Sequence, residues 1–253
     1  MLSYPASTSR DEKLEIINLI KNKLLSIYKA DIIAIGVYGS LALGNDGPFS
    51  DIEMHVVTKD GIEIKSYEFI YKKFKIEINT KQKNEFLNEA MMVDDSWAIR
   101  VGMFINILSI YDPNNFFNDV RKLSFHVSDT AIRETMREFM IWEPYETMAK
   151  IRNNYNCKNF NYLPLGAKDL IWQTSKLIGL ANKQYYTTRA RTFEESLKMN
   201  SKPSGYEELV FCVMEGKLND KEYIYKLCEG LWLGLNDWYV ELGIDYKVTK
   251  LPF

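Results

Sequence analysis

The segment AIGVYGS at residues 34–40 is followed after ten residues by DIEM at residues 51–54, and these two segments give the strongest indication of how the chain folds. The first segment belongs to an apolar, β-branched run over residues 31–38, which predicts a buried strand that ends before Gly39 and Ser40. A connection rich in glycine, asparagine and proline follows. The second segment opens a strand over residues 51–58, in which apolar and polar side chains partly alternate. The pattern therefore predicts two neighbouring strands joined by a turn that contains glycine.

Further helices and strands are predicted on both sides of this pair. Ser9 and Glu12 form a capping box at the start of an apolar helical stripe. Residues 67–71 and 74–79 predict a hairpin. After Lys81 helical patterns dominate the chain. We therefore expect an α+β fold in which a small mixed sheet is followed by a helical bundle.

The length of 253 residues suits one large or two medium domains. The change of pattern predicts a small α/β domain over residues 1–125 and a helical domain over residues 126–253. The formal net charge is −2, from 32 Lys and Arg against 34 Asp and Glu, which argues against nucleic acid as a partner.

The apolar runs and the cysteines bear on where in the cell the protein works. The sequence has no apolar run of the length that a membrane span requires, so we expect no membrane partner. The three cysteines form no CxxC pair, which predicts free thiols in a reducing cytoplasm.

Three carboxylates carry the chemistry. Asp51 and Glu53 are two residues apart on one strand, so both leave the same face. Glu77, between Ile76 and Ile78, has the alternation that places it on that face too. Neighbouring carboxylates repel one another unless a cation lies between them, and Mg²⁺ prefers oxygen ligands. The sequence predicts a site for one or two Mg²⁺ ions, of the kind used in phosphoryl or nucleotidyl transfer.

The strand, the Gly-Ser pair, the ten-residue gap and the Asp-x-Glu strand resemble the signature of the nucleotidyltransferase superfamily that includes DNA polymerase β. The chain is similar at a closer level to the kanamycin nucleotidyltransferase family, the aminoglycoside 4′-O-nucleotidyltransferases. The stretches that carry this resemblance are AIGVYGSL (34–41), DGPFSDIEM (46–54), PSGYEEL (203–209) and LPF (251–253).

The resemblance implies a cytoplasmic enzyme that transfers a nucleoside monophosphate from Mg-bound ATP, or another nucleoside triphosphate, to the 4′-hydroxyl of an aminoglycoside antibiotic. Pyrophosphate leaves and the drug is inactivated. By motif position, Gly39 and Ser40 hold the triphosphate, and Asp51 and Glu53 bind Mg²⁺. Glu77 is the third acid, near both metal and substrate. The resemblance thus implies that residues 1–125 form the nucleotidyltransferase domain with the metal and nucleotide site, and that the helical domain over residues 126–253 carries the general base.

The family's general base lies in the helical half, and the stretch YETMAKIRN implies that Glu146 is this base and Lys150 the cation that faces the phosphates. Glu53, Glu77, Glu143 and Glu146 are the implied contacts to the antibiotic. The family's active site forms between subunits, so the resemblance also implies a homodimer in which Glu146 serves the metal site of the other chain.

Three positions depart from the family pattern. Leu43 stands where the family has an arginine near the phosphates. Pro144 predicts that the helix carrying Glu146 begins or bends there. A family glutamate that contacts the antibiotic falls nearest to Trp142 and Glu143; with Trp142 in its place, the pocket loses a charge and gains a stacking surface.

Other interpretations of the same residues stay open. Asp-x-Glu also suits a solvent-facing strand edge, and Glu146 with Lys150 suits a surface ion pair. Glu63, Glu68, Asp94 and Asp95 suit either an acidic rim around the cleft or a solvated face, and His55 is expected to point away from the acids or to the rim. The acceptor could be a lincosamide, another small hydroxyl compound or a protein side chain. A non-catalytic nucleotide-binding protein with this fold is the second alternative.

Overall fold

The computed structural model describes residues 4–253, and the chain divides into two compact units. The first unit runs to Met92 and takes up the chain again at Arg100–His126. The second comprises Val93–Ile99 and Val127–Phe253. The roles that we predicted for a domain over residues 1–125 and a domain over residues 126–253 stay predictions.

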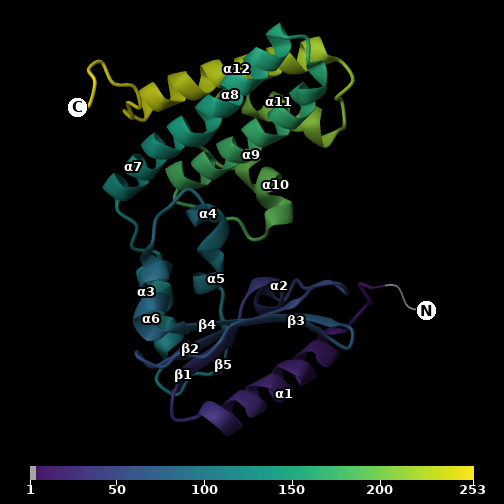
Figure 1. Cartoon of the computed structure of the whole chain (residues 1–253), viewed down its shortest axis with the longest axis vertical. Helices are drawn as coiled ribbons and strands as arrows, with labels where there is room; N and C mark the ends of the chain where they lie inside the picture. Colours follow the sequence, from purple (N-terminus) through teal and green to yellow (C-terminus); the bar gives the residue numbers. More distant parts are fainter. Residues whose placement is uncertain (1–3) are drawn as a thin grey trace. The chain divides into compact units, whose positions relative to one another are not determined.

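Within residues 4–253 the first unit holds a five-stranded mixed sheet in the order β3-β4-β2-β1-β5 (Figure 1). β2 and β4 run parallel, and the other neighbours are antiparallel. The sheet together with the helices of the second unit confirms the predicted α+β class. The strands are β1 (Ile32–Val37), β2 (Ile52–Thr58), β3 (Tyr67–Tyr71), β4 (Phe74–Gln82) and β5 (Leu108–Tyr111).

Helix α1 (Arg10–Tyr28) covers one face of the sheet (Figure 1). It begins at the predicted capping box, in which the Ser9 hydroxyl accepts from the Glu12 N–H and the Glu12 carboxylate accepts from the Ser9 N–H. Its apolar stripe packs on alternate residues of the strands, among them Met54 and Ile76. Since side chains alternate along a strand, Glu53 and Glu77 leave the sheet on the opposite face.

Elements of the first unit cover part of the opposite face. An apolar cluster there includes Val57 of β2, Phe86 and Phe117. The cluster lies toward the end of β2 at Thr58 and leaves the end at Glu53 half-buried. The covering elements are α3 (Lys83–Met91), α5 (Gly102–Ile105) and α6 (Phe116–Ser124), and α4 (Trp97–Arg100) stands at the boundary of the two units.

Two short elements were not predicted. The connection after β1 contains helix α2 (Gly39–Leu43), and β5 pairs with β1 at the edge of the sheet. Each has five residues or fewer. Such lengths are too short to show a periodicity, so tertiary contacts rather than local pattern decide them.

The second unit is a bundle around α9, which packs against α7, α8, α10, α11 and α12 (Figure 1). α9 is buried along most of its length. From residue 127 on, the elements of the second unit are α7 (Asp129–Met140), a π-helical turn η1 (Ile141–Tyr145), α8 (Glu146–Asn156), η2 (Phe160–Tyr162), α9 (Leu163–Ala181), η3 (Arg189–Arg191), α10 (Thr192–Leu197), α11 (Tyr206–Met214) and α12 (Lys221–Glu241).

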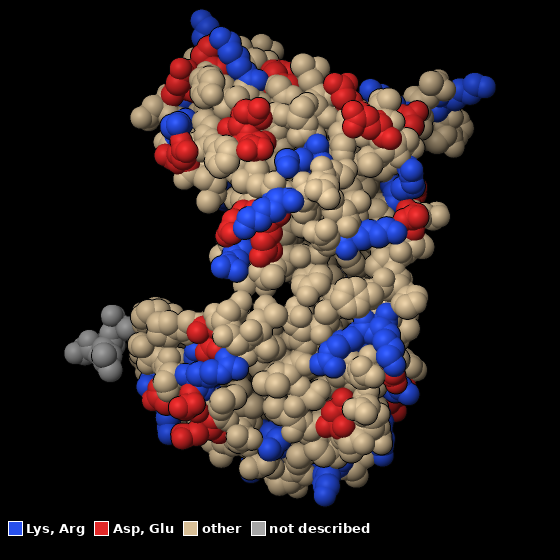
Figure 2. Space-filling model, turned by 180° about the vertical axis from the view of Figure 1, so that it is seen from behind, with Lys and Arg blue, Asp and Glu red and all other residues tan. Residues whose placement is uncertain are grey.

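The surface shown in Figure 2 carries mixed charges, and the cysteines form no disulfide within residues 4–253. On the face shown in Figure 2, Lys and Arg side chains lie interspersed with Asp and Glu. Cys157, Cys212 and Cys228 are free. None of the helices in residues 4–253 combines the length and the apolar character of a bilayer-spanning segment.

Candidate active site

The structure brings Asp51, Glu53 and Glu77 to one face at one end of the sheet. Glu53 of β2 and Glu77 of β4 are direct partners in the parallel register. Asp51 precedes β2 by one residue, two positions before Glu53. The alternation predicted from sequence therefore holds, and the three acids come from neighbouring segments of backbone.

Two side chains contact this acidic group. The Tyr38 hydroxyl donates to Oε1 of Glu77 at 2.9 Å. Lys75 Nζ lies 3.1 Å from Asp51 Oδ2 and 3.1 Å from Glu68 Oε1. Lys75 is therefore the cation that offsets part of the negative charge on this face.

The positive charge of Lys75 does not fully offset the negative charge of the three acids. Burial raises the pKa of the Glu53 carboxyl to about 7, the charges of Asp51 and Glu77 add to this, and Lys75 opposes it. The pKa of the Tyr38 hydroxyl is raised for the same reasons, by burial first and then by the charges of Glu77 and Glu53. Both shifts report a site in which another cation would stabilise the ionised carboxylates.

The fit of a metal ion can be tested on these groups. Across residues 4–253, no three His, Cys, Asp or Glu side chains stand in an arrangement ready to hold a metal ion. Asp51 is engaged by Lys75, and Glu77 by Tyr38. The oxygen donors and the raised pKa of Glu53 nevertheless suit a hard divalent cation, provided that Asp51 exchanges Lys75 for it. The metal ligands stay a prediction.

Gly39 joins the two parts of the sequence signature. Its φ is +70°, a conformation that glycine adopts without strain. A Cβ added at this position would overlap with the Glu53 carboxylate. The absence of a side chain therefore allows Glu53 to lie against the turn. The hydroxyl of Ser40 makes no hydrogen bond to any residue of 4–253.

Of the two positions expected for His55, the rim was wrong, because the ring is buried. It stacks on Tyr38 with ring centroids 4.1 Å apart, and Nε2 lies 3.1 Å from the Met103 carbonyl. Burial lowers its pKa to about 3, so the ring is neutral. His55 thus packs against one face of the Tyr38 ring, and the Tyr38 hydroxyl donates to Glu77. The aromatic neighbours that enclose His55 come from distant segments, so sequence pattern gave no signal.

In the second unit, Glu146 and Lys150 form an ion pair at 2.7 Å, one turn apart on α8. The hydrogen bond and charge of Glu146 raise the pKa of Lys150. Their side chains are 59% and 55% exposed, so both are open to a ligand. Pro144 lies in η1, and α8 begins at Glu146, as predicted from the proline.

One residue that bonds Glu143 and Thr147, on either side of Glu146 in the chain, was missed. Gln173 of α9 donates through Nε2 to Glu143 Oε2 at 2.8 Å and to Thr147 Oγ1 at 2.9 Å. Glu143 and Trp142 line a cavity of about 320 Å³ within the second unit, which we call the Trp142 cavity. Its other lining residues are Val93, Asp94, Asp95, Thr135, Glu138 and Phe139.

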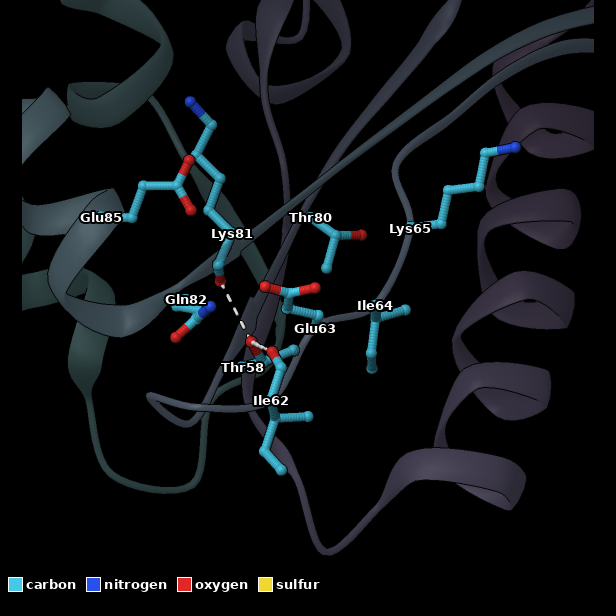
Figure 3. A pocket seen from close by; sticks show the side chains of 9 residues that line it. All are labelled: Thr58, Ile62, Glu63, Ile64, Lys65, Thr80, Lys81, Gln82 and Glu85. Carbon is cyan, nitrogen blue, oxygen red and sulfur yellow. Dashed lines mark hydrogen bonds between the residues drawn. The ribbon is translucent and has the colours of Figure 1, made fainter.

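A second cavity, of about 440 Å³, lies at the carboxyl ends of β2 and β4 (Figure 3). Thr58, on its wall, is five residues along β2 from Glu53, or about 17 Å at the usual strand rise. Glu63 points into this cavity and is therefore not a neighbour of Glu53. Of the other acids expected around the cleft, Glu68 contacts Lys75, whereas Asp94 and Asp95 belong to the second unit.

The sheet order and the position of these acids define a nucleotidyltransferase fold. A solved nucleotidyltransferase-like protein from Exiguobacterium sibiricum shares this fold, with a TM-score of 0.59 at 12% identity over 90% of this chain and 77% of that chain. The KNTase C-terminal domain matches residues 114–245. Two relatives named aminoglycoside nucleotidyltransferase (4′), from Staphylococcus aureus and a Bacillus species, are each 32% identical over 100% of both chains. The chain belongs to this aminoglycoside 4′-nucleotidyltransferase family, which confirms the resemblance found in the sequence.

Proposed function

We propose that this protein inactivates aminoglycoside antibiotics in the cytoplasm by transferring a nucleoside monophosphate from Mg-ATP to their 4′-hydroxyl. The observation that carries the proposal is the match, along the whole chain, to two relatives named for this activity. It is supported by three carboxylates on one sheet face, next to a glycine that lets one of them approach the turn.

The donor nucleotide is assigned to the first unit. The missing side chain at Gly39 lets the Glu53 carboxylate lie against the turn, and the unpaired Ser40 hydroxyl is available to donate to a phosphate oxygen. Asp51 and Glu53 would hold Mg²⁺, which supplies positive charge beside the phosphates when bound, and Glu77 completes the acidic wall. Lys75 moves from Asp51 to Glu68, which it already contacts.

The transfer itself is assigned to Glu146 and Lys150. The Glu146 carboxylate accepts the proton of the 4′-hydroxyl, whose oxygen bonds to the α-phosphorus as the bond from that phosphorus to the bridging oxygen breaks. Pyrophosphate leaves with the electron pair of that bond. The Lys150 ammonium stabilises the negative charge on the phosphate oxygens. Since Glu146 and Lys150 are paired, a bound phosphate would draw Lys150 away and leave the carboxylate free to act as a base.

The shared active site of a homodimer is part of the proposal and rests on the family resemblance. Sedimentation at assay concentration should show a dimer. Mixing E146Q chains with D51N chains should restore activity if each site combines residues of two copies, because a mixed dimer then has one intact site.

The activity is tested by pyrophosphate release with Mg-ATP and an aminoglycoside that carries a 4′-hydroxyl, with the product mass determined. Its 4′-deoxy analogue should not react. D51N should lose turnover while it retains the wild-type circular dichroism spectrum, and D119N, at an exposed acid of the same unit, should retain both. Turnover of the deoxy analogue would assign another hydroxyl, and no turnover of any aminoglycoside would overturn the proposal.

A further inference from the structure

Gln173 is a polar side chain in an apolar helix contact. It is 7% exposed, and Leu170 and Leu177, one turn away on each side of it along α9, are fully buried. A leucine or methionine of similar volume would fill this position without polar atoms. Burying an amide is unfavourable unless its hydrogen bonds are made, so a glutamine here calls for a reason.

The hydrogen bonds of Gln173 all leave from its nitrogen. The two N–H groups of Nε2 donate to Glu143 and Thr147, whereas Oε1 has no hydrogen-bond partner within residues 4–253. The ionised carboxylate of Glu143 can only accept, which fixes the orientation of the amide. The buried Oε1 of Gln173 is thus left without a hydrogen bond within residues 4–253, while both N–H groups of its amide donate.

The two acceptors of these hydrogen bonds lie on either side of the predicted base in the chain. Glu143 lies in η1, Thr147 lies in the first turn of α8, and Glu146 stands between them. Pro144 in η1 has no N–H to donate to the helix. The turn is therefore less well tied by its own backbone, and the bridge from Gln173 links Glu143 to Thr147 across the junction of η1 and α8.

We propose that Gln173 is a positioning residue, which orients the Glu143 carboxylate so that this group binds an ammonium substituent of the aminoglycoside in the Trp142 cavity. This inference rests on the function proposed above. One carboxylate oxygen of Glu143 is held by the amide, and the other, Oε1, has no hydrogen-bond partner within residues 4–253; the residue as a whole is exposed.

The partners of two of the other acids in this cavity favour Glu143 for that contact. Asp95 is paired with Lys176 at 2.5 Å, and Glu138 has Arg137 within 3.6 Å. Their charges are partly neutralised before any ligand arrives. Glu143 is held by a neutral amide and forms no ion pair within residues 4–253, and the neighbouring exposed ring of Trp142 adds an aromatic face for the same cation.

A double-mutant cycle tests this inference in the full-length protein. Q173L removes both donors at similar volume, and E143Q keeps an acceptor for Gln173 but removes the charge. We expect each to raise the KM for the aminoglycoside about tenfold, the effect of losing one hydrogen bond to a charged group. The KM for ATP should stay within about twofold. T174V, at the next residue of α9, loses a buried hydroxyl bonded to Leu170 and controls for loss of stability alone.

The double variant Q173L/E143Q separates positioning from packing. If Gln173 acts through Glu143, the double variant has the aminoglycoside KM of E143Q, because there is no charge left to position. If the two effects multiply, or if Q173L changes KM no more than T174V does, the inference is overturned. Turnover by the wild type in the same assay shows that the proposed function stands independently of this result.

Discussion

The ion pair between Lys13 and Asp46 offers the sharpest test of how the first unit is held together. Lys13 of α1 is completely buried, and Nζ lies 3.0 Å from Asp46 Oδ2 and 2.6 Å from the Gly47 carbonyl. The Asp46 side chain is 4% exposed and also pairs with Arg10. The perturbation is D46N, which keeps the shape and removes the charge.

The cost follows from which cation is left alone. In D46N the Lys13 ammonium stays buried with no counter-charge, and breaking a buried pair from one side costs roughly 3–5 kcal/mol. Arg10 is 41% exposed and retains the Leu41 carbonyl, so water compensates for its loss. We therefore expect the lower end of the range, a loss of about 3 kcal/mol in the free energy of unfolding at pH 7.

The same carboxyl predicts a pH dependence. Burial acts to raise the pKa of Asp46, but the hydrogen bonds and charges of Lys13 and Arg10 outweigh it and place the pKa below the ordinary value of 3.8. A folded-state pKa below the unfolded one gives stability that is present above about pH 4 and is lost as the pH falls through the folded value. D46N has no such carboxyl, so its deficit relative to wild type should shrink at low pH.

Urea unfolding at pH 7 and pH 3, at constant ionic strength, measures both effects. D119N removes one member of an exposed ion pair with Lys122 in the same unit and should change stability by less than about 0.5 kcal/mol. A D46N deficit below about 1 kcal/mol at pH 7, or a deficit of the same size at both pH values, would refute the reasoning.

Two further substitutions test the proposed site. E146Q should lower kcat by about 10²- to 10⁴-fold, the usual contribution of a general base. Its Tm should not shift, because Lys150 is exposed and the ion pair with Glu146 adds little stability. A change in kcat below about threefold would exclude Glu146 as the base. G39A should abolish Mg-ATP binding in calorimetry, because its Cβ overlaps with Glu53, whereas G44A, at φ +73° with open space around it, has the same backbone strain and should still bind. Equal binding by the two variants would contradict the role assigned to the close approach of Gly39 and Glu53.

The parts of the site that depend on local pattern were predictable. Strand alternation placed Asp51 and Glu53 on one face, and the proline before Glu146 marked where α8 begins. Gln173 gave no such signal, because its role depends on a helix that lies 30 residues along the chain from Glu143. The rim position expected for His55 was wrong for a related reason, since a polar residue two positions after Glu53 suggests exposure until its aromatic neighbours are known.

The ten-residue gap between Ser40 and Asp51 has a physical explanation in the structure. β1 and β2 are antiparallel, so the chain must reverse between them, and the Tyr38 N–H donates to the Glu53 carbonyl at 3.0 Å just beyond the paired strands. The gap contains one short helix and a turn, and this turn is fixed to the N-terminal segment, since Lys13 bonds Gly47 and Thr8 bonds Pro48. The position of Asp51 therefore depends on α1 as well as on β2. A weakened Lys13–Asp46 pair should loosen Asp51 before it unfolds the sheet, so Mg-ATP binding by D46N should fall at urea concentrations where its strands are still intact.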